Sequence, residues 1–368
     1  MPSSIVLAAW LGLIVALANG QHDLNAHPEA SQSADLPNPA GTVSASASPV
    51  EEPATRREQT ATEPALKPKV ALRAARPWSF TATVGPVALG AALAFKIEDV
   101  LNVPLFVLTL ATTLSVHAAG NLMNTYFDFR RGVDTPTSSD LTLVKGQLLP
   151  RQVAKLIGGS YGIAAATAIP LCMLSRAPLH LLASLLATGA ASAFVYTGGP
   201  GLKYKALGDL LISGTFGPLL VAFTYAVQTG TIGWKPLVAS LPITLHIEAI
   251  LHANNARDVE EDVASGIMTL AARLGEHKSY LFYAVLLALP YLAPIYAASC
   301  HSLLAALPLA TVPAARKLAT DFAGGRFVDL PKRTAKLQFL FAALLVVGSL
   351  LPSPSLKSVI RSIFAAFL

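Results

Sequence analysis

The sequence holds little charge and few cysteines, and each shortage excludes a class of protein. Only 13% of the 368 residues are Asp, Glu, Lys or Arg, whereas 53% are hydrophobic. Soluble globular domains carry about 25% charged residues, so this composition excludes an ordinary soluble fold. Two cysteines, Cys172 and Cys300, are too few for a disulfide-rich scaffold. We expect two buried free thiols, with a single disulfide as the alternative.

The net charge is basic, but no basic patch accompanies it. The chain has 27 Lys and Arg residues against 21 Asp and Glu residues, a formal charge of +6. Proteins that bind nucleic acids gather their cations on one face or stripe. Here the cations are spread between apolar stretches, so we predict that they record membrane topology and that the chain has no nucleic-acid partner.

Both ends of the chain differ from its middle. Residues 1–18 contain a short apolar run that ends in small residues but has no basic start, so it is predicted to be a cleaved signal or a retained anchor. Residues 19–75 are rich in Pro, Ala, Ser and Thr without an apolar periodicity, which predicts a disordered tail. A membrane domain is expected over residues 76–352, with a C-terminal tail over 353–368.

The middle of the chain contains repeated apolar stretches of roughly the length that crosses a bilayer. They predict an all-α multi-span membrane protein with about nine transmembrane helices. The stretches are Trp78–Phe95, Pro104–Asn124, Val153–Leu174, Leu179–Thr197, Leu207–Thr229, Pro236–Asn255, Tyr280–Ser299, Ser302–Ala319 and Leu337–Leu351.

The loops between these stretches differ in charge. Those after the first, third, fifth and seventh stretches contain only Lys96, Arg176 and Lys235, whereas most other Lys and Arg residues follow the even-numbered stretches. The positive-inside rule therefore places the even-numbered loops in the cytosol. The segment before Trp78 is then cytosolic as well, which argues against cleavage of residues 1–18 and is compatible with a retained anchor.

A polar cluster closes the sixth stretch. Asp258 and Asp262 are four residues apart and share one face of a helix, with Asn254 and Asn255 one turn earlier. Like charges at that spacing repel, so the pair favours a bound cation. Oxygen ligands without cysteine indicate Mg²⁺, which commonly joins carboxylates to phosphates. Taken alone, a solvated helix end is an equal alternative.

A second polar cluster closes the second stretch. Asn121, Asn124 and Asp128 follow one another at spacings of three and four residues, and Asp134 comes soon after. Polar groups at this depth are costly unless they serve a site. Two such clusters on the same side of the membrane predict a cradle for a diphosphate held through Mg²⁺. Without the metal, carboxylate and phosphate charges about 4 Å apart would repel by roughly 4 kcal/mol.

Three motifs give the sequence a family resemblance. They are Gly120–Phe129 with Gly132 and Asp134, Tyr196–Tyr204 with Leu207–Asp209, and Glu248–Asp258 with Glu260, Asp262, Gly266 and Thr269–Ala271. In these motifs the chain resembles the UbiA superfamily of intramembrane prenyltransferases, and most closely its MenA-like vitamin K branch of animals and bacteria. The resemblance covers about Arg73 to Pro352 and implies a UbiA-type helical bundle.

The resemblance also implies roles for individual residues. The implied ligands of Mg²⁺ are Asn124, Asp128, Asp258 and Asp262. The implied catalytic residues are Asp128, Asp258, Asp262, Lys203 and Tyr196. The residues implied to bind the diphosphate or the prenyl chain are Asn121, Asn124, Asp134, Lys203, Asn254, Asn255 and Arg257. Three positions depart from the family: Thr125 and Asn255 stand where many members carry Asp, and Leu141 stands where relatives carry Arg.

Histidines near the motifs have a plainer explanation. His246 and His252, with Glu248 between them, fit no standard zinc spacing, and hydrogen bonding between helices is the favoured interpretation. His117, one turn before Asn121, is predicted to be structural for the same reason.

The activity implied by the resemblance is Mg²⁺-dependent transfer of a geranylgeranyl group from its diphosphate to a naphthoquinone (menadione or menadiol), giving menaquinone-4. Roles in ubiquinone synthesis and in sterol-pathway regulation, through a membrane-bound reductase as partner, are implied beside it. The alternatives are 4-hydroxybenzoate prenylation, a transporter and a non-catalytic lipid sensor. The N-terminus lacks an Arg-rich presequence, which favours the endoplasmic reticulum or Golgi and leaves a mitochondrial membrane as the alternative.

Overall fold

The structure, a computed structural model, describes residues 65–367. The predicted signal or anchor, residues 1–18, lies outside the described residues, as does the predicted tail up to residue 64. The end of that tail is not disordered as predicted, because Pro68–Ala74 form helix α2. Ala74 is buried in a cluster with Leu122, Leu148 and Val153. A proline in the first turn and apolar residues one helical turn apart explain this helix.

The part of the chain that the structure describes contains eight helical segments long and apolar enough to cross a membrane. They are η2 (Pro77–Phe80) with α3 (Thr81–Glu98), α4 (Val103–Arg130), α5 (Pro150–Leu174), α6 (Leu179–Thr197), α7 (Gly208–Gly214) through η4 (Thr215–Leu219) to α8 (Leu220–Thr229), α9 (Trp234–Arg257), α11 (Leu270–Ala288) through η5 (Leu289–Tyr291) to α12 (Leu292–Cys300), and α14 (Leu330–Leu350). The chain is therefore an all-α integral membrane protein, as predicted.

The predicted stretch 302–319 is helical but is not among those eight segments. It is divided between the 3-10 helix η6 (Leu303–Thr311) and α13 (Val312–Ala323), and each piece is short. Pro308 lies inside η6, and a second proline lies in the first turn of α13. Proline removes a backbone donor and disturbs the preceding turn, which explains the division. Both pieces pack against α14.

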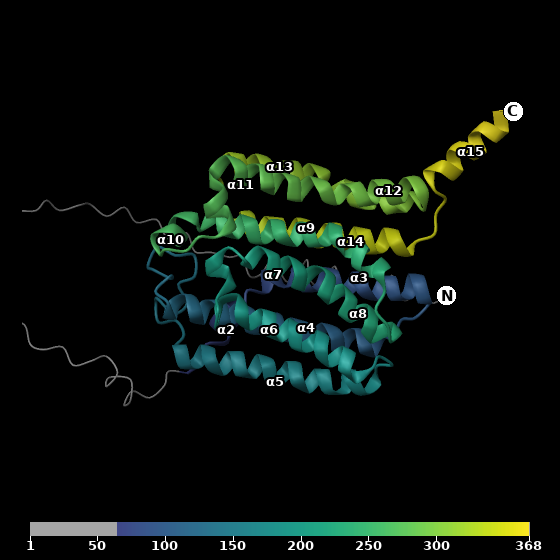
Figure 1. The fold of residues 1–368 in the computed structure, drawn as a ribbon. Coiled ribbons are helices and arrows are strands. Elements are labelled where there is room, and N and C mark those ends of the chain that lie inside the picture. The colour runs from purple at the N-terminus through teal and green to yellow at the C-terminus, as the bar shows by residue number, and fades with distance from the viewer. Residues whose placement is uncertain (1–64, 368) are drawn as a thin grey trace, which may run out of the picture. The chain divides into compact units, whose positions relative to one another are not determined.

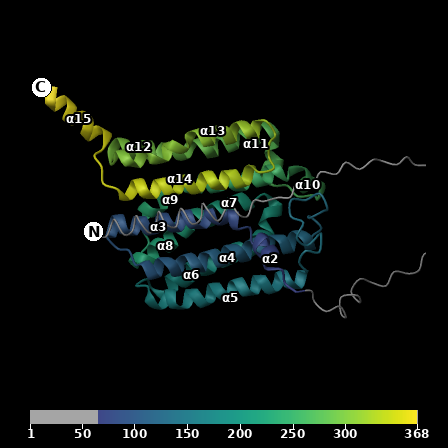
Figure 2. The same ribbon diagram turned by 180° about the vertical axis from the view of Figure 1, so that it is seen from behind.

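The helices are arranged in layers around α3 and α9. Figures 1 and 2 show α11, α12 and α13 along one side of the bundle, α9 and α14 beneath them, and α5 along the opposite side. Most of α3 and α9 is buried, whereas α5 and α6 are largely exposed. Their exposed Ile163, Ile169, Met173 and Leu179 suit contact with lipid.

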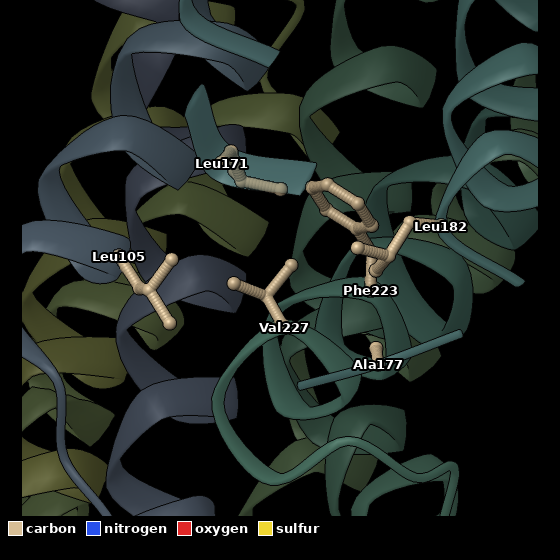
Figure 3. Close-up of a cluster of buried hydrophobic side chains, with 6 residues drawn as sticks. All are labelled: Leu105, Leu171, Ala177, Leu182, Phe223 and Val227. Carbon is tan, nitrogen blue, oxygen red and sulfur yellow. The ribbon is translucent and has the colours of Figure 1, made fainter. Parts of the chain in front are cut away.

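Small residues let the inner helices approach closely. A Cβ atom on Gly217 would lie 1.9 Å from Thr244 Oγ1 of α9, and one on Gly90 would lie 2.9 Å from the Val221 carbonyl oxygen of α8. In lipid, such close backbone approach replaces hydrophobic burial as a source of helix association. Apolar packing closes one end of the bundle, where α4, α5, α6 and α8 meet (Figure 3). Its buried residues are Leu105, Leu171, Ala177, Leu182, Phe223 and Val227.

The remaining elements connect or extend the bundle. The 3-10 helix η3 (Leu202–Lys205) follows α6, and α10 (Val259–Ala264) follows α9. The predicted C-terminal tail contains α15 (Leu356–Phe367), which projects from the bundle in Figure 1. Cys172 and Cys300 are both free, which confirms the expectation of unpaired thiols, but both are partly exposed rather than buried as expected.

Candidate functional site

A cavity of about 200 Å³ lies inside the bundle. Its walls come from α3, α4, α6, the α7–α8 segment and α9. Side chains with charged or amide groups gather at one end: Arg76, Asn121, Asn124, Lys203 and Asn254. Much of the remaining wall is apolar, with Leu185, Leu186, Leu219, Phe223 and Ile247 among its residues. We call the end of the bundle where α4 and α9 terminate the charged end.

Asp128 is the central carboxylate of the α4 cluster. It is 4% exposed, and its two oxygens accept from different donors. Lys203 Nζ lies 2.7 Å from Oδ2, and the Tyr204 hydroxyl donates to Oδ1 at 2.7 Å. Both donors belong to η3, which follows a tight turn at Gly201 with φ +56°. A Cβ atom there would lie 2.5 Å from the Tyr204 ring, so glycine is required for this arrangement.

Arg76 links the α4 cluster to the loop between α4 and α5. Its guanidinium lies 3.0 Å from Asp140 Oδ2, and the same oxygen accepts from the Thr125 hydroxyl at 2.7 Å. When the Asn124 amide is oriented with its oxygen toward Arg76 Nη1, at 3.0 Å, its nitrogen lies 3.1 Å from Asp128 Oδ2. Thr125 therefore serves the loop carboxylate, although many relatives were expected to have an acidic residue in its place.

The α9 cluster is organised by Arg257. Its guanidinium binds both oxygens of Asp258, with Nε to Oδ1 and Nη2 to Oδ2 each at 2.7 Å. Nη2 also donates to Asn254 Oδ1 and to Ser139 Oγ, both at 3.0 Å. Asp262 and Asn255 are each 3% exposed. Ser139 and Asp140, which directly precede Leu141, thus bring the α4–α5 loop against both clusters. Arg257 contacts Ser139, and Arg76 contacts Asp140.

Lys203 interacts electrostatically with carboxylates of both clusters. Burial lowers the pKa of the Lys203 ammonium, but Asp128 and then Asp262 raise it above its ordinary value. Lys203 is therefore within electrostatic reach of both halves of the site.

Two carboxyl groups of the site carry raised pKa values. Burial, then the charges of Asp128 and Asp140, raise the pKa of Asp134 to about 7. Burial also raises the pKa of Asp262 to about 6. The charge of Lys203 lowers this pKa, but the charges of Asp258 and Asp128 raise it again. By contrast, although burial acts against it, Arg76 holds the pKa of Asp140 well below its usual range. Burial is the largest cause of both raised values, and the balance of charged groups acts in the same direction. The carboxylates of the site outnumber the three cations paired with them, Arg76, Lys203 and Arg257; these carboxylates are Asp128, Asp134, Asp140, Asp258 and Asp262.

The donors fit a hard cation chemically, although they do not form a closed metal site. Within residues 65–367, no three His, Cys, Asp or Glu side chains are grouped to hold a metal ion. The predicted ligands offer only oxygen donors, which is the set that Mg²⁺ prefers. They are the predicted Asn124, Asp128, Asp258 and Asp262. Two of them, Asp128 and Asp258, are paired with Lys203 and Arg257.

The structure divides the predicted site residues into two groups. Asn121, Asn124, Tyr196, Lys203 and Asn254 line the cavity. The others surround its charged end without lining it: Asp128, Asp134, Asn255, Arg257, Asp258 and Asp262.

The histidines of α9 lie apart from this site. The His252 ring is bonded to Ser279, with Nε2 2.8 Å from its hydroxyl, and the His246 ring packs edge-on against Phe341. Both rings are buried between helices. The predicted hydrogen bond between helices is present for His252, whereas neither ring nitrogen of His246 has a hydrogen-bond partner among the described residues, so His246 is held by packing.

Sequence reasoning missed several groups at the charged end. Arg76, the first residue of the predicted membrane domain, was given no role in the site, yet it lines the cavity and pairs with Asp140. Ser139 and Asp140 had no assigned role, since a loop gives no helical spacing from which to place them. The sequence did contain a signal for Arg76, because this arginine directly adjoins the first apolar segment. A charged side chain in that place needs a partner or a ligand.

Comparisons with known proteins show which family the sequence matches. The family model described as "UbiA prenyltransferase family" matches residues 83–351. The chain is 46% identical over 287 residues to the Homo sapiens "UbiA prenyltransferase domain-containing protein 1", which covers 78% of this chain and 85% of that protein.

Solved structures show the same fold. The apo structure of a UbiA homolog from Aeropyrum pernix aligns with a TM-score of 0.58 at 18% identity, over 73% of this chain and 97% of that one. A UbiA homolog from Archaeoglobus fulgidus bound to GPP and Mg²⁺ aligns with a TM-score of 0.51 at 14% identity, over 76% and 98%.

Proposed function

The chain belongs to the UbiA prenyltransferase family, and we propose that it transfers a geranylgeranyl group from its diphosphate to a naphthoquinone nucleus, giving menaquinone-4. The observation that carries this proposal is the cavity, which has a polar end and a largely apolar interior within the membrane domain. An allylic diphosphate has the same two parts. The choice of the vitamin K branch over other members of the family rests on the resemblance of the three sequence motifs.

The charged end is the proposed place of the diphosphate. Arg76 and Lys203 line the cavity there, and Arg257 is bonded to the cavity-lining Asn254. Cations of this kind form charge-assisted hydrogen bonds with phosphate oxygens. Asp128 and Asp258 hold Lys203 and Arg257 in position, so these cations are arranged before substrate arrives.

Mg²⁺ is the proposed cofactor. The Archaeoglobus fulgidus homolog was solved with GPP and Mg²⁺. In this chain Asn124, Asp128, Asp258 and Asp262 would hold the ion, and its positive charge would stabilise the departing diphosphate. The excess negative charge at Asp134 and Asp262 supports this proposal, because a divalent cation would neutralise it.

In the proposed reaction, the bond between the allylic carbon and the diphosphate oxygen breaks, and its electron pair leaves with the diphosphate. Lys203, Arg76 and Arg257 stabilise that leaving charge. A ring carbon of the acceptor in its hydroquinone form, menadiol, then bonds to the allylic carbon, and the ring proton passes to water or to the released diphosphate, which restores aromaticity. The immediate product is menaquinol-4, and its later two-electron oxidation, outside this reaction, gives menaquinone-4. The apolar walls exclude water from the cation, and the Tyr196 ring lines the cavity where it can stabilise positive charge.

Other features of the proposal come from the family resemblance. We place the enzyme in the endoplasmic reticulum or Golgi membrane, with a mitochondrial membrane as the alternative. A contribution to ubiquinone synthesis and an association with a membrane-bound sterol-pathway reductase are proposed on the same ground. Prenylation of 4-hydroxybenzoate is the competing activity, and it becomes one outcome of the test below.

The test is a prenyl-transfer assay with membranes that contain the protein. Membranes are incubated with geranylgeranyl diphosphate, Mg²⁺ and either menadiol or 4-hydroxybenzoate, and products are identified by mass spectrometry. We expect menaquinone-4, and we expect Asp258→Asn to lower the rate by about 100-fold or more. Asp329→Asn is the matched control, because Asp329 is an exposed carboxylate outside the site. Product from 4-hydroxybenzoate alone would show that the proposed acceptor is wrong.

A further inference from the structure

One wall of the cavity carries polar groups that a prenyl chain does not need. Ser79, Thr83, His117 and Asn121 all line the cavity, from η2, α3 and α4. Thr83 is only 1% exposed. Polar side chains inside a membrane domain are costly unless they bond to each other or to a ligand. These four do bond to each other, and the directions of their bonds show what remains for a ligand.

The Ser79 hydroxyl fixes which groups donate and which accept in this hydrogen-bond network. Its oxygen lies 2.8 Å from the carbonyl oxygen of Arg76, to which it donates its single proton. Ser79 Oγ must therefore accept from its other neighbours, Asn121 Nδ2 at 3.0 Å and His117 Nε2 at 3.2 Å. His117 thus carries its proton on Nε2, and its Nδ1 is an acceptor. The Thr83 hydroxyl, 2.7 Å away, donates to that nitrogen.

This assignment uses up the donors of the wall and leaves acceptors. Asn121 Nδ2 donates both to Ser79 and to the Ala75 carbonyl oxygen, the latter at 2.8 Å. Thr83 Oγ1 has given its proton to His117 and retains lone pairs. Among residues 65–367, no side chain or backbone group is seen to donate to Asn121 Oδ1 or to Thr83 Oγ1. A ligand that suits this wall therefore brings a hydroxyl group that donates.

The position of the wall matches the second substrate. His117, Asn121 and Asn124 follow one another along one face of α4, and one helical turn rises about 5.4 Å. His117 and Thr83 therefore lie one to two turns further into the membrane domain than Asn124, where the diphosphate is proposed to bind. The reacting allylic carbon adjoins the diphosphate, so the acceptor ring belongs at this depth. Phe216, which also lines the cavity, is 4.7 Å from the His117 ring and offers a face for a flat aromatic ring.

We propose that this wall is the acceptor site, in which a ring hydroxyl of an aromatic diol donates a hydrogen bond to Thr83 Oγ1. The inference rests on the proposed function, and it assigns Thr83 as the residue that selects the acceptor. His117 is a positioning residue, because it holds the Thr83 proton and leaves the Thr83 oxygen only lone pairs to offer to a ligand. An oxidised quinone has no hydroxyl to offer and would face the wall with acceptors only. The site therefore selects a hydroquinone.

The test compares menadiol with its monomethyl ethers on the same enzyme. Membranes with wild-type protein or Thr83→Val are given geranylgeranyl diphosphate, Mg²⁺ and menadiol or each of its two monomethyl ethers in turn, under reducing and oxygen-free conditions. Valine has nearly the shape of threonine but no hydroxyl. We expect Thr83→Val to lower kcat/KM for menadiol by about tenfold, the effect of one lost hydrogen bond, and to leave the KM for geranylgeranyl diphosphate unchanged.

The ratio of the two acceptors is the decisive readout, because it does not depend on the amount of folded enzyme. Wild-type protein should prefer menadiol to the ether that lacks the recognised hydroxyl, and this preference should fall by about tenfold in Thr83→Val. Thr83→Ser should restore it. Thr109→Val is the matched control, since Thr109 is a buried threonine of α4 whose hydroxyl bonds only to its own helix and which does not line the cavity.

Two results would overturn the inference. One is an unchanged preference between the two acceptors in Thr83→Val. The other is a raised KM for geranylgeranyl diphosphate in that variant with an unchanged KM for menadiol, which would assign the wall to the prenyl chain. Failure of the proposed function looks different, because wild-type protein would then prenylate neither menadiol nor its ethers.

Discussion

Two clusters of charged side chains lie toward the charged end of the bundle, and they differ in how their charges balance. Asp321 of α13 lies between two arginines, with Arg326 Nη2 at 2.5 Å from Oδ1 and Arg333 bonded to Oδ2. These bonds, first from Arg333 and then from Arg326, lower the pKa of Asp321 to about 2. In the site between α4 and α9, by contrast, the pKa values of Asp134 and Asp262 are raised.

The difference separates a structural cluster from a binding site. The Asp321 cluster has its cations already and gains nothing from a ligand. Its place beside Phe322, whose ring stacks on His252 of α9, indicates that it ties α13 and α14 to the bundle. The site has carboxylates in excess and cavity-lining cations that can turn to phosphate. Perturbed carboxyl groups beside a cavity are typical of functional sites, whereas a matched ion cluster is typical of structure.

Removal of the central carboxylate from each cluster should give the largest contrast. We expect Asp128→Asn to lower the rate of prenyl transfer by about 100-fold or more, because Asp128 holds Lys203 and is a proposed metal ligand. Asp321→Asn should leave the rate per folded molecule within about twofold and lower the thermal midpoint instead. Product formation and unfolding are measured on the same detergent-solubilised preparations.

The comparison would fail if Asp321→Asn abolished transfer in a protein that remained folded. It would also fail if Asp128→Asn retained wild-type activity, because the site would then not depend on its most buried paired carboxylate.

The α4 and α9 clusters themselves could be predicted because each is local. Asn121, Asn124 and Asp128 lie on one helix at spacings that define a face, and Asp258 and Asp262 are also one turn apart. The cations that complete the site are distant in sequence. Lys203 meets Asp128 across 75 residues and Arg76 meets Asp140 across 64, so helical spacing could not pair them. Lys203 was identified through the family motif, and Arg76 was missed.

The helices, like the site residues, could be predicted only where the signal lies within one stretch of sequence. Hydropathy predicted the membrane segments, because each stretch contains the signal for its own burial. It did not reveal that the stretch 302–319 is divided at prolines into η6 and α13, nor that Pro68–Ala74 form a helix. Residues such as Thr83 and His117 became interpretable only when their hydrogen-bond directions were known.

Two of the three cations of the site, Lys203 and Arg257, should differ in importance. The side chains of the Lys203–Asp128 pair are 12% and 5% exposed, whereas those of the Arg257–Asp258 pair are 20% and 21% exposed. Loss of a buried partner leaves the other charge uncompensated, and water compensates less in the deeper pair. We expect Lys203→Met to lower kcat/KM by about 100-fold and Arg257→Met by about tenfold. Lys332→Met is the control, because Lys332 is an exposed lysine 3.9 Å from Asp329. Equal losses in the two site variants would contradict the ranking by burial.

Arg76 gives a smaller contrast with a neighbour in the same segment. We expect Arg76→Gln to raise the KM for geranylgeranyl diphosphate by about fivefold, since the arginine lines the cavity and contributes one charge-assisted bond. Arg73→Gln is the matched control, because Arg73 bonds to Gln147 of the same loop but is exposed and does not line the cavity. Initial rates at varied diphosphate concentration distinguish them. An equal rise in both variants would show that Arg76 acts only through the loop.

The smallest expected effect is a difference in the sign of pH dependence. The pKa of Asp134 is raised from 3.8 to about 7 by folding, so its neutral form is favoured in the folded state and its contribution to stability is lost as pH rises through about 7. The pKa of Asp321 is lowered from 3.8 to about 2, so its contribution is present above pH 4 and is lost as pH falls toward 2.

Thermal midpoints of wild-type protein, Asp134→Asn and Asp321→Asn, measured with a chelator from pH 3 to 8, should show this difference in pH dependence. The thermal midpoint of Asp134→Asn should rise a few degrees above that of wild type toward pH 8. The thermal midpoint of Asp321→Asn should lie below that of wild type at neutral pH and approach it as pH falls below 4. Parallel profiles for the two variants would mean that the clusters do not differ in charge balance, and Mg²⁺ would then have no excess carboxylate charge to neutralise.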